Sequence, residues 1–486
     1  MSGKPWEIIV GDVRRVLREM EAESFDACFS DLPYGIGMNG AGTKWDYDIP
    51  SVNVFVEILR VLKPGAFAMF FGGTRTFHRV VCNIEDAGFL PCDLVLWMYG
   101  SGFPKSHDIS KAIDKKLGAK RRVVGTKRGT HSANGSGLGG VEAGVKQKQV
   151  DVPITESATT EGLRWSGQGT ALKPAWEPIS LCCKPYRGNI ADGALEHGVG
   201  GLAIDASRVG TTGGTAGHDY AKTGLFGMGG KATIEKLNAG RWPANVMLQH
   251  SPGCVQRGTR EVRTGVAVKH NGVTHAGRVL SSQLGTYPAG TPDVTYGQDG
   301  KETIAAWECE SDCPVRILDQ QSGKTKSPSA SYVAHRKTLK TGVDIASRAP
   351  TTLIQGHGDE GGASRFFYTS KVSREERDRG LHDFETVAKG VGALRDGSRR
   401  GLAKNGHATL KPIDLCCYYA RMLLPPPRRD GKPRRLLVCY SGAGSEMCGA
   451  LQAGWDEVVG IELVPKHAEW ARARIAKGQI IRNAKK

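Results

Sequence analysis

A short apolar run, residues 25–29, leads directly into the loop Asp31-Leu32-Pro33-Tyr34-Gly35. The run predicts a buried strand. The loop cannot continue that strand, because Pro fixes φ and Gly loosens the chain. A carboxylate and an aromatic ring are therefore held on a stiff loop at the carboxyl end of a strand. In open α/β sheets ligands bind at this position, so the loop predicts a functional site.

Strands and helices alternate on both sides of this loop. Apolar positions recur at helical spacing in three stretches, and apolar runs of strand length separate them. The alternation predicts an α/β fold whose strands are largely parallel and joined by right-handed crossovers. The expected helices are 13–20, 52–62 and 75–86, and the expected strands are 8–12, 25–29, 66–71, 94–98 and 179–183.

A second strand–turn–helix unit lies near the other end of the chain. Strand 434–440 passes into the tight turn Ser441-Gly442-Ala443-Gly444-Ser445, which opens a helix at 447–453. A second strand, 458–462, ends in Glu462, 18 residues after Gly444. The turn lets the backbone approach a ligand closely, and the terminal acid can bind a ribose diol. The unit lacks the third Gly of the dinucleotide fingerprint, which argues against NAD.

The loop Asp31-Leu32-Pro33-Tyr34 resembles the Asp-Pro-Pro-Tyr loop of DNA methyltransferases that act on exocyclic amino groups, adenine N6 or cytosine N4. Leu32 stands where that family usually has its first Pro. Further blocks resemble the family in the same order. They are Gly11-Asp12, Leu62-Lys63-Pro64-Gly65, Phe71-Gly72-Gly73, Gly102-Phe103-Pro104-Lys105-Ser106, and residues 405–412, where Ala408 replaces a Pro of the family block His-Pro-Thr-x-Lys-Pro.

The catalytic loop precedes the cofactor turn, which is the β-class order of this phage and bacterial family. The resemblance implies a Rossmann-like, S-adenosylmethionine-dependent methyltransferase fold, circularly permuted, with a large irregular insert. It also implies two sets of site residues. The catalytic set is Asp31, Leu32, Pro33 and Tyr34, and the cofactor-binding set is Tyr440, Ser441, Gly442, Gly444, Glu462, Thr409, Lys411, Phe71 and Gly72.

The chemistry of an exocyclic amino group explains the catalytic residue types. Its nitrogen is a poor nucleophile, because the lone pair is delocalised into the ring. Asp31 and the carbonyl of residue 32 can accept its two N–H hydrogen bonds and hold the nitrogen in line with the incoming methyl group. Tyr34 would stack on a base flipped out of duplex DNA. A buried Tyr on an ordinary strand-to-loop turn is the alternative interpretation of these four residues.

Asp31 at the first position of the loop favours adenine N6, because cytosine N4 enzymes often have Ser there. Cytosine N4 remains the first alternative. Residues 438–440 read Val-Cys-Tyr where the family usually has Asp-Pro-Phe. Together with Leu32 and Ala408, this departure keeps open a DNA-binding protein with a decayed methyltransferase domain.

Three regions are expected along the chain: a catalytic half at 1–185, a target-recognition insert at 186–362, and a cofactor-binding half at 363–486. The insert is rich in Gly, Thr and Ser and lacks helical periodicity. Residues 120–160 are rich in Gly, Ser, Lys and Arg, which predicts a mobile basic loop. This loop could clamp phosphates or could serve as a solvated linker.

Two ligand pairs lie inside the insert: His250 with Cys254, and Cys309 with Cys313. Each pair is spaced to share one turn, and together they could supply four ligands for a tetrahedral structural zinc. The region has few core-forming residues, so a metal would help to hold it together. The alternative is four unrelated residues, with the two later cysteines packing as small apolar groups.

Composition points to a polyanionic partner. Lys and Arg number 66 and Asp and Glu 49 in 486 residues, which gives a net charge of +17 and a pI near 9.3. Such a charge suits double-stranded DNA, although it could serve solubility alone. Twelve scattered Cys suit a reducing cytoplasm, of a bacterium or of a phage-infected host. No signal peptide or membrane span is expected. Related β-class enzymes are often homodimers, and the sequence leaves a restriction endonuclease partner undecided.

Overall fold

The computed structural model describes most of the chain, with gaps. The described residues are 5–35, 46, 48–100, 106–130, 149–209, 242–263, 301–326, 332–334, 352–354, 360–370, 378, 380–382, 384, 387–388, 402–403, 405, 407 and 410–484. They form two compact units. Unit 1 comprises residues 1–203, 245–253 and 369–486, and unit 2 comprises residues 204–244 and 254–368. None of the helices described has the length and apolar composition needed to cross a membrane.

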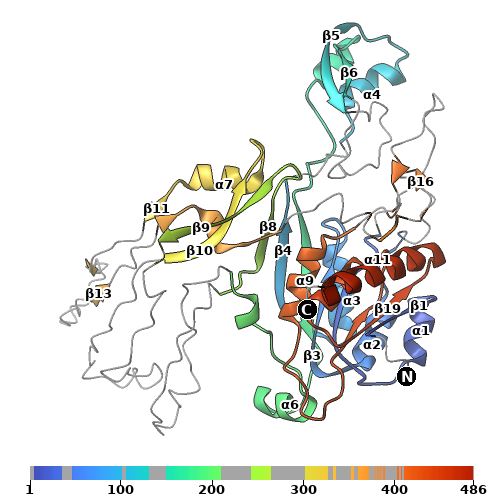
Figure 1. Ribbon diagram of the computed structural model, residues 1–486. Coiled ribbons are helices and arrows are strands. Elements are labelled where there is room, and N and C mark those ends of the chain that lie inside the picture. Colours follow the sequence, from blue (N-terminus) through green and yellow to red (C-terminus); the bar gives the residue numbers. More distant parts are fainter. Residues whose placement is uncertain are drawn as a thin grey trace, which may run out of the picture. The chain divides into compact units, whose positions relative to one another are not determined.

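Unit 1 is built on a mixed, largely parallel sheet (Figure 1). Its strands lie in the order β1-β19-β18-β2-β3-β7-β4-β8-β15. The first five run parallel to one another, and β7 is antiparallel to both β3 and β4. The strands are β1 (Trp6–Val10), β2 (Phe25–Asp31), β3 (Leu62–Phe71), β4 (Leu90–Met98), β7 (Trp176–Cys183), β8 (Val246–Gln249), β15 (Tyr368–Ser370), β18 (Arg435–Val438) and β19 (Glu457–Glu462).

Helices of unit 1 lie at the predicted positions 13–20, 52–62, 75–86 and 447–453, and those at 109–116, 160–164 and 190–197 were not predicted. The described helices of the unit are α1 (Val13–Glu19), α2 (Val52–Val61), α3 (Phe77–Asp86), α4 (Ile109–Lys116), α5 (Thr160–Arg164), α6 (Ile190–His197), α9 (Ile413–Met422), α10 (Ser445–Ala453) and α11 (Pro465–Ala484). The chain runs from β2 through α2 to β3, and from β18 through α10 to β19, in opposite directions along the sheet. Right-handed crossovers in opposite directions place their helices on opposite faces.

The core has two layers, one on each face of the sheet. Neighbouring strand residues point to opposite faces of the sheet. Two consecutive residues of β3 show this. The Phe70 ring packs edge-on against Phe55 of α2 at 5.5 Å, whereas the Phe71 ring meets Tyr419 of α9 at 6.1 Å. All four aromatic side chains are buried. Both faces of the sheet are therefore covered by helices, which explains the nearly continuous apolar sequence of β2 and β3.

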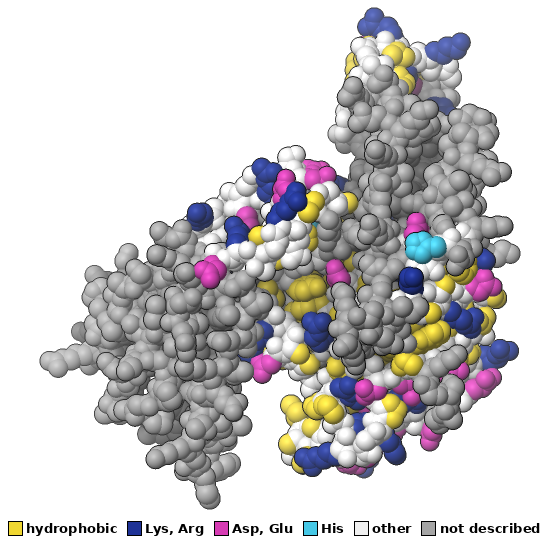
Figure 2. All heavy atoms as spheres, viewed as in Figure 1, with side chains coloured by type: hydrophobic (Ala, Val, Ile, Leu, Met, Phe, Trp, Pro, Cys, Tyr) yellow, Lys and Arg dark blue, Asp and Glu magenta, His cyan; other side chains and the backbone are white. Residues whose placement is uncertain are grey.

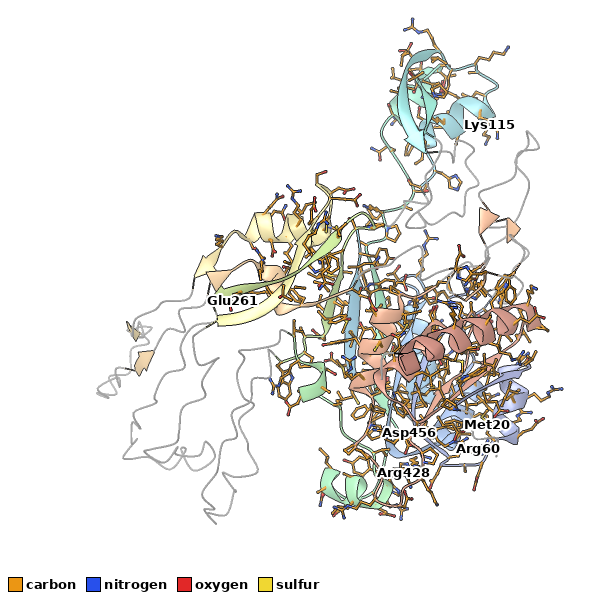
Figure 3. All side chains as sticks on the ribbon, in the orientation of Figure 1. Met20, Arg60, Lys115, Glu261, Arg428 and Asp456 are labelled. Atoms are coloured by element: carbon orange, nitrogen blue, oxygen red, sulfur yellow. The ribbon has the colours of Figure 1, made fainter. Side chains whose placement is uncertain are left out.

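Arg60 ties α1 to α2. Its guanidinium donates to the carbonyl oxygens of Leu17 at 2.7 Å and Met20 at 2.9 Å, at the C-terminal end of α1. Arg60 and Met20 are labelled in Figure 3. A cationic donor at this end adds hydrogen bonds to carbonyls of the last turn and complements the helix dipole.

Part of the predicted basic loop at 120–160 forms paired strands. β5 (Val123–Thr130) runs antiparallel to β6 (Gln149–Thr155). Arg121 anchors their base, because its guanidinium donates to Asp114 Oδ2 at 2.5 Å and to the Thr155 carbonyl at 3.1 Å. Over the face of the molecule that Figure 2 shows, the described Lys and Arg side chains are interspersed with Asp and Glu side chains.

The aromatic segment 363–370 forms two short elements. A 3₁₀ turn, η4 (Ala363–Phe366), precedes β15, and the Asp319 carboxylate accepts from both the backbone N–H and the hydroxyl of Ser364 at 2.7 Å. This local side-chain pairing favours a turn over a strand. The short two-stranded pairing of β16 (Val387–Ala388) with β17 (Leu402–Ala403) follows in unit 1.

Unit 2 contains an antiparallel pair, β9 (Val255–Arg263) and β10 (Lys301–Glu308), followed by α7 (Pro314–Ser322). Its shorter elements are η2 (Asp205–Ser207), β11 (Thr325–Lys326), β12 (Tyr332–Ala334), β13 (Thr352–Ile354) and β14 (Glu360–Gly361). Unit 2 lies mostly inside the predicted insert at 186–362, but it begins at Ile204, so α6 belongs to unit 1. The three predicted regions stay a prediction.

Candidate active site

The strand order of unit 1 reverses between β18 and β2. From this point the chain moves one way through α2 to β3, and the other way through α10 to β19. Helices that leave such a point on opposite faces open a crevice at the carboxyl ends of the two strands, where ligands of open α/β sheets bind. The Ser30 hydroxyl locks the two strands together by accepting from the backbone N–H of Cys439 at 2.7 Å. The crevice therefore lies between the Asp31 loop and the Gly442 turn.

The Asp31 loop is pinned by backbone hydrogen bonds. Asp46 Oδ1 accepts from the backbone N–H of Tyr34 at 2.7 Å and of Gly35 at 3.0 Å, and the Thr76 hydroxyl donates to the Tyr34 carbonyl at 2.6 Å. The Leu32 side chain packs into the core beneath. Leu32 therefore anchors the loop to the core by an apolar contact, and its carbonyl remains part of the loop.

Lys411 lies at the centre of a buried polar cluster. Its ammonium is 2.9 Å from Asp31 Oδ2 and 3.1 Å from Glu177 Oε2, and it donates to the Tyr34 hydroxyl at 3.0 Å. The Tyr34 hydroxyl in turn donates to Glu177 Oε2 at 2.7 Å. The Lys411 side chain is 4% exposed, so these partners replace water almost completely. The ammonium also lies within 6.0 Å of the ring centroids of Tyr34, Phe71 and Trp97.

Burial and charge oppose each other in this cluster. Burial raises the pKa of Asp31, and the Lys411 ammonium counteracts that rise. Burial alone would favour a neutral amine at Lys411, but Asp31 and Glu177 together raise its pKa and keep it charged. Burial and the same two carboxylates raise the pKa of the Tyr34 hydroxyl, which therefore remains a donor. One fixed cation thus holds two carboxylates.

Lys411 forms an ion pair with only one of the two oxygens of Asp31. Oδ2 faces the ammonium, whereas Oδ1 is buried and has no hydrogen-bond partner among the described residues. A buried acceptor without a partner costs about 1–3 kcal/mol, so such atoms are rare away from ligand sites. Oδ1 is thus an acceptor held ready at the end of β2.

The Gly turn after β18 is shaped by Glu462, the last residue of β19. Glu462 Oε2 accepts from the backbone N–H of Gly442 at 2.8 Å, and Oε1 accepts from that of Val464 at 2.9 Å. Gly442 and Gly444 have φ of +48° and +80°, a region that favours glycine. A Cβ at Gly442 would lie 2.9 Å from Nε2 of His407. Glycine is therefore required here by both conformation and space.

A cavity of about 470 Å³ joins the loop and the turn. Its volume lies within the range of small-molecule sites, roughly 300–1,000 Å³. Glu446, in the first turn of α10, reaches the wall, where burial and then the charge of Asp31 raise its pKa to about 8. The Ser441 hydroxyl is a second buried polar atom of the lining without a described partner.

The structure brings most of the predicted site residues to this one cavity. Those that line it are Asp31, Leu32, Pro33, Lys411, Tyr440, Ser441, Gly442 and Glu462. Tyr34, Phe71, Gly72 and Gly444 are not among the lining residues. Phe71 is fully buried, and the Gly72 N–H donates to the Pro178 carbonyl at 2.9 Å, so both support the wall from behind. Thr409 lies outside the described residues. The roles assigned to all of them remain predictions.

Three polar residues of the site, Glu177, Glu446 and His467, were missed by sequence reasoning. Glu177 comes from β7, and only the pairing of β7 with β3 brings it to Lys411. Glu446 follows the Gly turn directly, so its position could have been a signal. His407 and His467 line the cavity with their rings 4.6 Å apart. His407 belongs to the block 405–412, which did point to it.

The predicted metal ligands also come together. One ligand atom from each of His250, Cys254, Cys309 and Cys313 lies within 4.8 Å of all the others. None of the twelve cysteines is in a disulfide in the described structure.

The chain matches no protein-family model. It also matches no curated protein sequence.

Among solved structures, three similar chains were compared. TTHA0409 from Thermus thermophilus, described as a DNA modification methylase and complexed with S-adenosyl-L-methionine, is 11% identical, with a TM-score of 0.31 over 97% of this chain and 95% of that chain. M1.HpyAVI in its SAM complex is 8% identical, with a TM-score of 0.31 over 97% of this chain and 98% of that chain. The PvuII DNA methyltransferase, cytosine-N4-specific, is 10% identical, with a TM-score of 0.34 over 99% and 92%. At these values the similarity carries no argument, and function must be inferred from the residues of this chain.

Proposed function

We propose that this protein is a DNA methyltransferase that transfers a methyl group from S-adenosylmethionine to an exocyclic amino group, N6 of adenine. The observation that carries the proposal is the asymmetry of Asp31, a residue of the cavity lining. One of its oxygens is bound to Lys411, and the other is buried without a described partner. An amino group presents two N–H donors, and Asp31 Oδ1 and the residue-32 carbonyl are two acceptors on adjacent residues. The net charge of +17 suits duplex DNA as the substrate.

The cavity fits the proposed cofactor on three features. Gly442, at φ +48°, brings the backbone of the turn to the cavity wall without a side chain. The Ser441 hydroxyl is a buried polar atom of the lining without a described partner, and Glu462 keeps a second lone pair on each oxygen for a ribose hydroxyl. When bound, S-adenosylmethionine supplies an electrophilic methyl group. Tyr440, Ser441, Gly442 and Glu462 would hold it.

The residues of the loop would orient the amino nitrogen. Accepting its N–H bonds at Asp31 Oδ1 and at the residue-32 carbonyl draws the lone pair toward the methyl group and increases nucleophilicity. Lys411 fixes the Asp31 carboxylate, so little reorganisation is needed when the base enters. Enzymes that act on a base inside a duplex extrude it from the stack, so the target base would leave the duplex, and the Tyr34 ring would stack on it. Direct displacement would form the N–C bond as the S–C bond of the sulfonium breaks, release a neutral thioether and one amino proton, and require no covalent enzyme intermediate.

Cytosine N4 is the alternative target, because the same two acceptors can orient its amino group. The proposal also keeps the finer predictions made from the resemblance: the circularly permuted order of the two halves, and target recognition by the insert. β18 and β19, the strands of the C-terminal half, lie between β1 and β2 in the sheet, which supports the permuted order.

Two measurements test the proposal. Isothermal titration should detect S-adenosylmethionine binding to the full chain, and DNA of varied sequence incubated with the labelled cofactor should yield labelled N6-methyladenine after digestion to nucleosides. Label in N4-methylcytosine would keep the mechanism and reverse the base. Failure to bind the cofactor would contradict the proposal and favour a DNA-binding protein with a decayed domain.

A further inference from the structure

Three cysteines converge in unit 2 because of strand register. β9 and β10 are antiparallel with Val255 opposite Glu308, so Cys254 and Cys309, each one residue beyond that pair, emerge at the same end of the hairpin (Figure 1). Residues separated by 55 positions in sequence are thereby placed side by side. A turn closed by the Cys313 N–H donating to the Glu310 carbonyl at 3.1 Å then brings Cys313 back toward them.

Two backbone features suit these sulfur atoms to metal binding. Cys313 is the N-cap of α7, where unpaired backbone N–H groups and the helix dipole stabilise negative charge. The backbone N–H of Glu310 donates to the Cys254 sulfur. Backbone donors of this kind orient a thiolate and offset its charge, as the outer partners of a metal ligand do.

His250 completes the set from four residues before Cys254. Its donor nitrogen and the three sulfur atoms all lie within 4.8 Å of one another. In a tetrahedral zinc site with Zn–S of about 2.3 Å and Zn–N of about 2.0 Å, ligand atoms are roughly 3.5–3.8 Å apart. The observed group therefore needs only small side-chain movements to close around one ion.

The described part of unit 2 has a small apolar core that a metal ion would supplement. Among its described residues, the buried apolar side chains are Cys254, Cys313 and Val315. Two of these three are candidate ligands, so the apolar core that the structure describes here is very small. Small folds without a sufficient core commonly rely on a metal or on disulfides.

We propose that His250, Cys254, Cys309 and Cys313 bind one zinc ion at a structural site that holds the β9–β10 hairpin to the start of α7. Four protein ligands close the coordination sphere and leave no position for water or substrate, so the ion takes no part in methyl transfer. The proposal is independent of the function assigned to the cavity in unit 1.

The test is metal analysis of the full-length protein purified under reducing conditions without added metal. Wild-type protein should contain one equivalent of zinc per chain, and Cys309→Ser and Cys313→Ser should each fall below about half an equivalent after dialysis against a chelator. The matched control is Cys92→Ser, an exposed cysteine outside the cluster, which should retain one equivalent. Zinc retained equally by Cys309→Ser and the control would overturn the proposal.

A second measurement on wild-type protein covers variants that fail to fold. Stepwise modification of thiols with an organomercurial, followed with a chromophoric zinc indicator, should release the zinc as the cluster thiols react. Cobalt substitution should give the absorption of a tetrahedral thiolate complex. Wild-type protein that contains no zinc, even when expressed in zinc-supplemented medium, or whose cluster cysteines form a disulfide, would contradict the proposal.

Discussion

Replacing Lys411 with Met removes the cation from the buried cluster while keeping most of the side-chain volume. The ammonium has contacts of 2.9 Å with Asp31 and 3.1 Å with Glu177, and it is 4% exposed. Its loss leaves two carboxylates close together without a counter-charge. Breaking a buried ion pair in this way costs about 3–5 kcal/mol, because the remaining charge is neither solvated nor paired. Lys411→Met should therefore lower the free energy of unfolding by about this amount near neutral pH.

The loss should shrink at low pH. Burial already raises the pKa of Asp31 above its unfolded value, and removal of Lys411 would raise it further. A carboxyl group whose pKa is raised in the folded state contributes stability that is present below the unfolded pKa and is lost as pH rises through the folded pKa. Lys411→Met should thus approach wild-type stability as pH falls toward 5. Urea unfolding followed by tryptophan fluorescence at pH 5, 6.5 and 8 measures this.

Two controls make the result specific. Lys111, 54% exposed and 3.7 Å from Asp108, gives the matched variant Lys111→Met, which should cost less than about 1 kcal/mol at every pH. The double variant Lys411→Met with Glu177→Gln removes one of the two uncompensated charges and should regain part of the loss. If Lys411→Met behaves like Lys111→Met, with a small and pH-independent effect, the account of the cluster is refuted.

Three further predictions concern the cavity. Burial and the charge of Asp31 raise the pKa of Glu446 to about 8. The free energy of unfolding of the wild type should therefore fall as pH rises from about 4.5 to about 8, by up to about 1.4 kcal/mol per pH unit. Glu446→Gln should flatten that slope in urea titrations, and equal slopes for the two proteins would contradict the prediction. Gly442→Ala should weaken cofactor binding at least about tenfold, because its Cβ would lie 2.9 Å from His407. The control Gly431→Ala, at φ +69° with no atom within 4 Å, should lose only about 1 kcal/mol of stability from its backbone conformation and keep its cofactor affinity. Similar affinities of the two variants by calorimetry would refute the prediction. Tyr34→Phe should keep the initial rate of methyl transfer within about tenfold of the wild-type rate, and Tyr34→Ala should reduce it further, because base stacking needs the ring and not the hydroxyl. The opposite order of initial rates would exclude stacking.

The Asp31 loop and the Gly442 turn could be predicted from the sequence because their conformations are set locally. Pro33 stops a strand, and glycines at positive φ open a tight turn, wherever they stand in the fold. The meeting of the two elements was implied by the resemblance, whose permuted order brings Asp31 and Gly442 to neighbouring strand ends.

The partners of Lys411 could not be predicted in the same way. Glu177 and Tyr34 are 143 residues apart, and their hydrogen bond depends on the antiparallel insertion of β7 between β3 and β4. Glu446 stands directly after the Gly turn, which is a local signal of its position. Its burial depends on the close approach of α9 to α10, where a Cβ at Gly449 would lie 2.6 Å from the Cβ of Cys416. Long-range packing of this kind cannot be predicted from local sequence.

The measurement that tests the central claim most directly compares Asp31→Asn with wild type in single-turnover methyl transfer at equal cofactor occupancy. Asn keeps the shape of Asp31 but loses its charge, and Lys411 retains Glu177 as a partner. The account predicts nearly unchanged cofactor binding and a transfer rate reduced by about 10²-fold or more, the scale of losing an electrostatic contact in the transition state. A variant that binds the cofactor and methylates DNA at close to the wild-type rate would contradict it.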